Sequence, residues 1–126
     1  MRYRPDEKRL KVKVIGSEEL ILIRATKSQH LPADEISITQ LSTIPLIVPK
    51  EGSGIRDVIF EYLQRFKVTP TIVMESGSVE LVKELVRQDK GVSLLERYAV
   101  QDDLKKRFFR SVRILEGSPI IEFGIG

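Results

Sequence analysis

Two short turns of glycine and serine are the residues of this chain best suited to chemistry. The first is Glu51-Gly52-Ser53-Gly54 and the second is Glu75-Ser76-Gly77-Ser78. Their hydroxyl groups and accessible backbone N–H groups can bind the oxygens of an anion or of a strongly polar molecule. The candidate ligand-binding residues are therefore Gly52, Ser53, Gly54, Ser76, Gly77 and Ser78. Ser53 and Ser78 are also typical N-cap residues, so an ordinary capping role stays open for each.

Each turn follows an apolar run and precedes a helical pattern. Pro45–Val48 leads into the first turn and Thr71–Met74 into the second. Apolar residues at helical spacing then predict helices over 54–67 and 78–89. Two strand–turn–helix units in series predict parallel strands whose following helices begin at the same edge of the sheet. That edge is where α/β sheets usually bind ligands.

The rest of the pattern predicts a single α/β domain over residues 1–126, with a mixed sheet flanked by helices. Apolar and charged residues alternate over 10–14, which predicts a half-buried strand. A turn at 16–18 then leads into a more buried strand at 19–23. Further strands are predicted at 92–95, 109–115 and 119–125, and short helical pieces at 38–41, 96–100 and 102–108.

Composition is that of a soluble globular domain. The 126 residues are 41% hydrophobic and 31% charged, and no apolar stretch is long enough to cross a membrane. The chain has no cysteine, which removes disulfides and thiolate metal sites and fits a cytoplasmic protein. His30 is the only histidine. We therefore predict no metal site and no cofactor.

The formal net charge of +3 is concentrated at the N-terminus. Residues 1–13 hold six Lys and Arg against two Asp and Glu, or +4, which leaves −1 for the remainder. A body so close to neutral gives no argument for nucleic-acid binding, so we predict no DNA contact by this chain. The basic stretch is typical of a solvated tail, although a phosphate contact stays open.

Catalysis finds little support in these residues. A serine nucleophile needs a base within hydrogen-bond reach, and His30 lies in a polar loop. The Gly52–Gly54 turn lacks the length and the lysine of a phosphate-binding P-loop. We predict no catalytic residues and no enzyme, with a small α/β enzyme that uses the same crevice as an alternative.

The order of these segments resembles the second lobe of the effector-binding domain of LysR-type transcriptional regulators. No single motif is specific, but their order and spacing together are. The resemblance runs from about Leu10 to the C-terminus. The matching motifs are Leu20-Ile21-Leu22-Ile23, His30-Leu31-Pro32, Ile38-Thr39-Gln40-Leu41, Pro45-Leu46-Ile47-Val48, Glu51-Gly52-Ser53-Gly54-Ile55-Arg56, Glu75-Ser76-Gly77-Ser78 with Val82-Lys83, Gly91-Val92-Ser93-Leu94-Leu95 and Arg97-Tyr98-Ala99-Val100.

The resemblance implies one lobe of a type 2 periplasmic-binding-protein-like fold, here a truncated effector-binding domain with its crossover strands. Its ligand would be a small polar or anionic metabolite, bound in a cleft against the first lobe. DNA would be bound through a winged helix-turn-helix elsewhere in the parent protein, with no membrane contact. Crossover strands at 10–15 and 119–125 would leave apolar sheet edges, so we expect a homo-oligomer. A periplasmic-type solute-binding domain is a second alternative.

Two charged residues complete the candidate ligand-binding set. Lys50 precedes the first turn and would bind or screen an anion, although a lysine here is more often only solvated. Glu96 stands where the family commonly has a proline, directly after the strand at 92–95. A carboxylate there disfavours a purely anionic ligand, unless it pairs with Lys50, Arg97 or an amine of the ligand.

Overall fold

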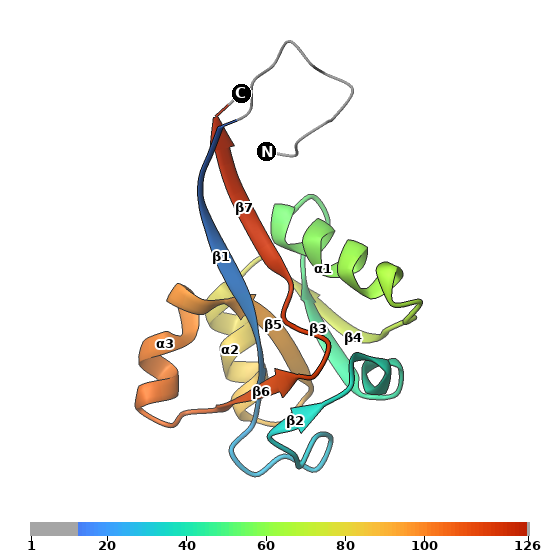
Figure 1. Cartoon of the computed structure of the whole chain (residues 1–126). Helices are drawn as coiled ribbons and strands as arrows, with labels where there is room; N and C mark the ends of the chain where they lie inside the picture. Colours follow the sequence, from blue (N-terminus) through green and yellow to red (C-terminus); the bar gives the residue numbers. More distant parts are fainter. Residues whose placement is uncertain (1–12, 126) are drawn as a thin grey trace.

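A long antiparallel pair of strands dominates the outline of the molecule (Figure 1). The computed structural model describes residues 13–125. Strand β1 (Lys13–Arg24) pairs with β7 (Ile120–Ile125), and the register shifts between Val14 and Gly16. These two strands form a ribbon that extends from the body of the lobe toward both termini (Figure 1).

The predicted turn at 16–18 is wrong, because β1 runs through it without interruption. The cause lies at the far end of the chain, since β7 supplies the hydrogen-bonding partner for this stretch. A one-residue irregularity next to Gly16 absorbs the change of register instead of a turn. Residues 10–12 of the predicted first strand lie outside the described residues.

The mixed sheet predicted from the sequence is confirmed. Its strands follow the order β2-β6-β1-β5-β3-β4, with β7 paired to β1. Strand β3 is parallel to β4 and to β5, whereas β1 is antiparallel to β5, β6 and β7. The remaining strands are β2 (Glu35–Ile36), β3 (Pro45–Pro49), β4 (Thr71–Ser76), β5 (Val92–Glu96) and β6 (Arg110–Ile114).

The helices are the 3-10 helix η1 (Ile38–Ser42), α1 (Gly54–Arg65), α2 (Val79–Arg87) and α3 (Arg97–Lys105). Helices α1 and α2 begin within a residue of their predicted starts and end two residues earlier, and Lys67 and Asp89 beyond them adopt a left-handed φ of 57°. The helical pieces predicted at 96–100 and 102–108 are confirmed as helical, but the break between them is wrong. A single helix, α3, takes their place, since no glycine or proline interrupts it.

Helices cover both faces of the sheet. On one face, η1 and α1 pack against Leu46, Val48 and Leu94. On the other face, α2 and α3 pack against Ile47 and Leu95. Successive side chains of a strand point to opposite faces, so the central strands β3 and β5 are buried on both sides. This three-layer packing holds the ends of β3, β4 and β5 at one edge.

Candidate functional site

The two glycine-serine turns lie side by side at that edge. Strands β3 and β4 run parallel and end in register at Pro49 and Ser76. The Lys50 N–H then donates to the Ser76 carbonyl at 3.0 Å, which ties one turn to the other. The predicted parallel pair, with both helices beginning at a common edge, is confirmed. The positive ends of two helix dipoles therefore flank the turns.

The first turn leaves hydrogen-bonding capacity unused. Ser53 is the N-cap residue of α1, with φ −77° and ψ 134°, but its side chain makes no capping hydrogen bond. Gly52 has φ +93°, which L side chains rarely adopt. The first N–H groups of a helix have no partner within the helix. Together with the Ser53 hydroxyl beside them, these N–H groups can donate hydrogen bonds to an oxygen of a carboxylate or phosphate.

The second turn is more occupied by the protein itself. The Ser78 hydroxyl accepts a hydrogen bond from the Leu81 N–H at 3.2 Å and so caps α2. The Ser76 hydroxyl accepts from the Ser78 N–H at 3.0 Å, a local turn bond. The Ser76 hydroxyl also donates to the Ser78 carbonyl at 3.4 Å, so its remaining capacity is a second lone pair, and it lines the cavity between the turns whereas Ser78 does not. Between the two serines, Ser76 is the better ligand contact.

A small cavity of about 100 Å³, here called the turn pocket, opens between the two turns. It has a polar rim, contributed by Lys50, Ser53, Ser76 and Gly77, above an apolar base. The base consists of Pro49, Ile55, Val79, Val82 and Leu95. A polar rim over an apolar base suits the polar end of a small molecule better than a large ligand.

Gly52, Gly54 and Ser78 lie beside the turn pocket without lining it. Gly52 and Gly54 are exposed in the first turn and Ser78 begins α2. The exposed Lys50 side chain lies over Gly77, since a Cβ added at Gly77 would sit 3.6 Å from the Lys50 Cδ. Among the described residues Lys50 forms no salt bridge, so its ammonium is available to an anion at the rim.

Glu96 ends β5 and occupies the N-cap position of α3, where its side chain makes no capping bond. Ile47 lies opposite Ser93 in the parallel strands β3 and β5. Three residues further along each chain segment, Lys50 therefore lies level with Glu96. Partial burial raises the pKa of the Glu96 carboxyl, and the nearby charge of Glu18 raises it further. Within residues 13–125 no salt bridge reaches Glu96. Its carboxylate is thus an uncompensated negative group beside the turns.

Arg97, which the sequence offered as a partner for Glu96, is engaged elsewhere. Its guanidinium forms an ion pair with Glu19 on β1. This hydrogen bond lowers the pKa of the Glu19 carboxyl. Glu18 accepts from the Tyr98 N–H at 2.8 Å, so α3 is held against β1 by both glutamates.

Arg56 supports the site, and its place in the first turn of a helix predicted either a contact with a ligand or partner or a salt bridge with Asp57 or Glu61. Its Nη1 donates to the Pro49 carbonyl at 2.9 Å and to Glu75 Oε2 at 2.8 Å, joining the ends of β3 and β4. Its guanidinium also lies 4.8 Å from the centre of the Phe60 ring. The dipole of a helix disfavours a cation in its first turn. The position of Arg56 therefore indicated that its guanidinium has a partner outside its own helix.

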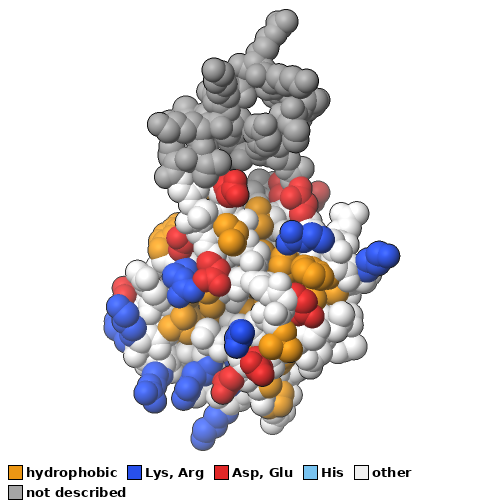
Figure 2. Space-filling view, in the orientation of Figure 1, with side chains coloured by type: hydrophobic (Ala, Val, Ile, Leu, Met, Phe, Trp, Pro, Cys, Tyr) orange, Lys and Arg blue, Asp and Glu red, His pale blue; other side chains and the backbone are white. Residues whose placement is uncertain are grey.

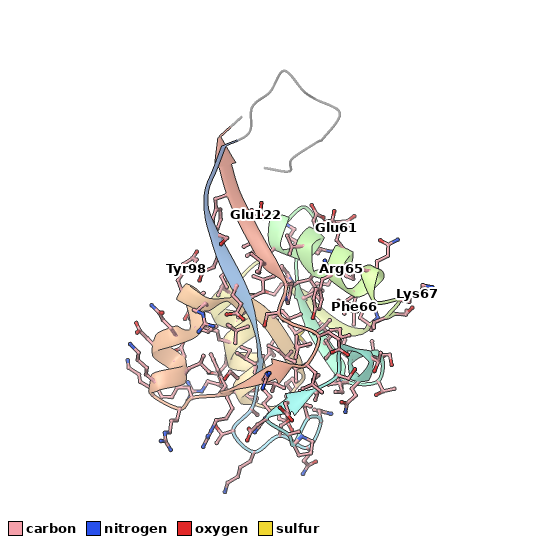
Figure 3. All side chains as sticks on the ribbon, in the orientation of Figure 1. Glu61, Arg65, Phe66, Lys67, Tyr98 and Glu122 are labelled. Atoms are coloured by element: carbon pink, nitrogen blue, oxygen red, sulfur yellow. The ribbon has the colours of Figure 1, made fainter. Side chains whose placement is uncertain are left out.

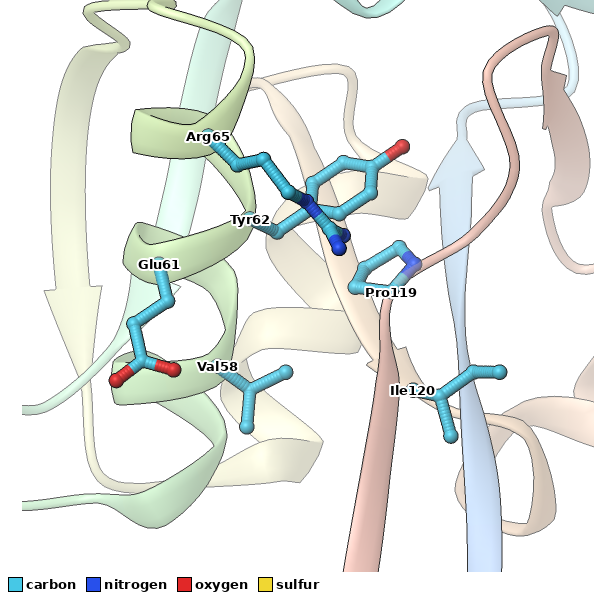
Figure 4. Close-up of a pocket in the computed structure, with 6 residues that line it drawn as sticks. All are labelled: Val58, Glu61, Tyr62, Arg65, Pro119 and Ile120. Atoms are coloured by element: carbon cyan, nitrogen blue, oxygen red, sulfur yellow. The ribbon is translucent and has the colours of Figure 1, made fainter. Parts of the chain in front are cut away.

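A larger hollow, here called the helix–strand groove, separates α1 from β7. It comprises two adjoining pockets of about 300 and 470 Å³ that share Val58, Glu61 and Ile120. Figure 4 shows the smaller of the two. Arg65 on α1 and Glu122 on β7 lie on either side of it (Figure 3). No sequence signal predicted this groove, since its walls come from segments far apart in the chain. The remaining lining residues are Gly54, Asp57, Tyr62, Pro119, Ile121 and Phe123.

Tyr62 closes the floor of the groove. Its side chain is almost fully buried and its hydroxyl donates to the Gly117 carbonyl. Burial raises the pKa of Tyr62 to about 12, with the charge of Glu116 adding to the shift and that of Arg65 opposing it. The phenol therefore stays neutral at ordinary pH, and its hydrogen bond connects α1 to the turn before β7.

Metal-binding and membrane features are absent from the part of the chain that the structure describes. Residues 13–125 contain no group of three or more His, Asp or Glu side chains placed to hold a metal ion. Within the same residues, none of the helices combines the length and the apolar character that a membrane span requires.

Comparison with protein families identifies a match to the LysR substrate binding domain over residues 1–125. Among curated proteins, the phosphonates import ATP-binding protein PhnC of Anaeromyxobacter dehalogenans is 28% identical over 114 residues, which are 88% of this chain and 23% of that protein. The uncharacterized HTH-type transcriptional regulator YeiE of Escherichia coli K12 is 28% identical over 92 residues, 70% of this chain and 30% of that protein. The chain thus spans less than a third of these relatives.

Solved structures share the fold. The effector binding domain of QuiR in complex with shikimate superposes with a TM-score of 0.77 at 18% identity, covering 97% of this chain and 57% of that one. The regulatory domain of Synechocystis PCC6803 CcmR in complex with 2-PG has a TM-score of 0.76 at 21% identity, covering 100% and 62%. The lobe of a periplasmic-binding-protein-like fold expected from the sequence is confirmed.

Proposed function

This chain belongs to the LysR substrate binding domain family, and on that premise we propose that it is the second, effector-sensing lobe of a LysR-type transcriptional regulator. The ligand is a small polar or anionic molecule held at the turn pocket. The observation that carries the proposal is the unused Ser53 hydroxyl at the start of α1, next to Ser76 at the end of β4.

The proposal gives a role in the site to every predicted residue except Ser78, which caps α2. Ser53 and the N–H groups of the first turn bind the anionic end of the ligand, and Lys50 neutralises it. Ser76 and Gly77 form the second wall of the turn pocket. Glu96 lies toward β1 and favours a ligand that also carries a hydrogen-bond donor or an amine.

In the parent protein, ligand binding would change the relative arrangement of the two lobes. That change would in turn alter the binding of DNA. The first lobe closes the cleft over the turns, and the β1/β7 ribbon is the connection between the lobes. A ligand that binds the closed arrangement more tightly shifts the population toward it. A winged helix-turn-helix in the parent recognises the DNA sequence, which places the protein in the cytoplasm.

Self-association is part of the same proposal. The expected unpaired crossover strands are in fact paired with each other, but other apolar surface stays open. Strand β4 forms one edge of the sheet and exposes Ile72, Val73 and Met74. An exposed apolar edge strand favours pairing with another chain, which supports a homo-oligomer.

The test is a ligand titration of the isotope-labelled chain followed by nuclear magnetic resonance, with shikimate and 2-PG as the first probes within a panel of small carboxylates and phosphates. A bound anion should shift the amide signals of Gly52, Gly54 and Gly77. Replacing Ser53 with alanine should weaken binding about tenfold, the effect of losing a hydrogen bond to a charged group. Ser111→Ala is the matched control, since Ser111 is exposed on β6.

Two results would overturn the proposal. Equal affinities for Ser53→Ala and Ser111→Ala would remove the first turn from the site. Chemical turnover of a panel compound, abolished by Ser53→Ala or Ser76→Ala, would favour the small α/β enzyme instead.

A second role is favoured by the relative named as an import ATP-binding protein. The same lobe would then report a solute to a transport ATPase, and its ligand would be a phosphonate-like anion that suits Lys50 and the helix N-termini. The reading frame around this chain separates the two roles, because a winged-helix segment supports the regulator and a nucleotide-binding segment supports the transporter.

A further inference from the structure

Nine residues at the end of α3 and the start of β6 carry five positive charges and no negative charge. We call the five side chains the basic corner. Each of them is exposed. They are Lys105, Lys106, Arg107, Arg110 and Arg113.

The fold gathers these charges at one end of the lobe. Arg107 has a φ of 60°, which ends α3 and turns the chain sharply into β6. Lys and Arg side chains accordingly crowd the surface at the lower left, over the end of α3 and the start of β6 (Figure 2). Arg87 on α2 adds a further cation, because its guanidinium lies 4.4 Å from the centre of the Phe108 ring, and the Thr26 hydroxyl donates to the Arg107 carbonyl at 3.2 Å.

Acidic side chains of the described residues do not neutralise the basic corner. None of its five members forms a salt bridge within residues 13–125. On α3, Asp103 is bound to Lys83 at 2.8 Å, and Asp102 lies one turn before Lys105 and Lys106 but forms no salt bridge with either of them. Glu35 lies opposite Arg113 in the sheet but makes no ion pair with it. Arg110 and Arg113 lie three residues apart on β6 and so point to opposite faces of the sheet, whereas Lys105, Lys106 and Arg107 are consecutive.

Helix stability explains only part of this arrangement. A cation in the last turn of a helix is favoured by the dipole, which accounts for Lys105 and in part for Lys106. The dipole acts over the last turn only, so it gives no reason for Arg110 and Arg113, which belong to β6. An unpaired group of like charges destabilises a folded protein, so a partner of opposite charge is the natural explanation.

The shape and composition of the surface narrow the class of partner. None of the pockets described above includes any member of the basic corner, so an extended polyanion fits better than a small anion. The cores of protein–protein interfaces are depleted in lysine, and within residues 105–113 the exposed apolar side chain is that of Phe108. Protein–DNA interfaces are rich in Lys and Arg that contact phosphates.

We propose that the basic corner binds the phosphate backbone of duplex DNA without reading its sequence. This goes beyond effector sensing and departs from the prediction that this chain makes no DNA contact. The prediction was based on the summed charge of the body of the domain, whereas DNA binding depends on where the charges lie on the surface. The contact would hold the sensing lobe against the DNA that the winged helix recognises.

Duplex binding by the 126-residue chain can be followed by fluorescence anisotropy with a duplex of about 20 base pairs of arbitrary sequence. The double variant Lys105→Gln/Lys106→Gln should bind about tenfold or more weakly at about 50 mM salt, because two phosphate contacts are lost. The slope of log K against log salt should fall by about 1.8, that is about 0.9 for each lost contact.

The matched control is Arg65→Gln/Lys67→Gln, which removes the same charge from the end of α1 (Figure 3). It should change the affinity less than about twofold. The charge-preserving variant Lys105→Arg/Lys106→Arg should bind like the unchanged chain, which separates loss of charge from loss of folding.

Several outcomes would overturn the proposal. Equal losses in the two double variants would mean that net charge alone drives binding, and unchanged binding in Lys105→Gln/Lys106→Gln would place the contact elsewhere, such as the basic stretch at 1–13. Tighter binding to poly-L-glutamate than to the duplex would indicate an acidic protein. Tighter binding to vesicles with about 30% phosphatidylserine in phosphatidylcholine would indicate a membrane surface.

Discussion

Replacing Gly91 with alanine tests how closely β3 and β5 approach each other below the candidate site. Gly91 precedes β5 and is buried against β3. A Cβ at this position would lie 2.9 Å from the Pro45 carbonyl oxygen and 3.1 Å from the Ile47 Cγ1. Ordinary contacts begin at 3.4 Å, so the first distance is short by 0.5 Å. The oxygen belongs to the backbone, so the strand itself must move.

The cost follows from this geometry. Forcing an extra methyl into a packed core typically costs about 1–3 kcal/mol. Glycine-to-alanine replacement also restricts the unfolded chain, which offsets about 0.4–1 kcal/mol. A net loss of about 1–2 kcal/mol should lower the melting temperature by about 4–8 °C in a domain of this size. Thermal unfolding followed by circular dichroism measures it.

Gly16→Ala is the control for Gly91→Ala, because a Cβ at Gly16 has no atom within 4 Å and its backbone is not left-handed. That variant should be neutral or slightly more stable. If both variants melt within about 2 °C of each other, the close approach of β3 and β5 is wrong. The candidate site should also respond to Gly91→Ala, because Lys50 and Glu96 lie level at the ends of these two strands.

Three further predictions concern single side chains. Ser93→Ala should lower the free energy of unfolding by about 1 kcal/mol, since the buried Ser93 hydroxyl donates to the Ile47 carbonyl at 2.7 Å; an unchanged denaturation midpoint would contradict this. The pKa of Tyr62, raised from 10.0 to about 12, gives stability that is complete below pH 10.0 and is lost as the pH rises toward about 12. Ultraviolet absorbance titration should therefore lose its highest phase in Tyr62→Phe. The hydrogen bond to Arg97 lowers the pKa of Glu19 from 4.5, so its contribution is present above that pH and is lost as the pH falls through the lowered value. Acid unfolding of Glu19→Gln should be less steep than that of the unchanged chain, and identical acid curves would refute the pairing.

Local patterns explain why much of the fold could be predicted. The strands that contain Leu46 and Leu94 and the helix that contains Ile59 follow from apolar spacing over a few residues, and Ser53 and Ser78 mark the helix starts. The errors arose where a distant partner decides the outcome. Residues 16–18 have the composition of a turn, but they form part of a strand because β7 pairs with them.

The same contrast between local patterns and distant partners applies to the candidate site. The glycine-serine turns and Lys50 were found from the chain because strand, turn and helix are consecutive in it. The Arg56–Glu75 pair and the Arg97–Glu19 pair could not be found, because each joins residues from different elements. The helix–strand groove was missed for the same reason, since α1 and β7 meet only in the folded lobe.

The sequence by itself determined the elements, their order and the two turns, because backbone preference and the period of apolar residues act over short distances. Only the tertiary structure decided what these elements bring together. It left the Ser53 hydroxyl open while the Ser78 hydroxyl caps α2, and it set Glu96 beside Glu18 without a cation. It also turned a nearly neutral body into a lobe with a basic corner, because electrostatic fields depend on the positions of charges in space and not on their sum.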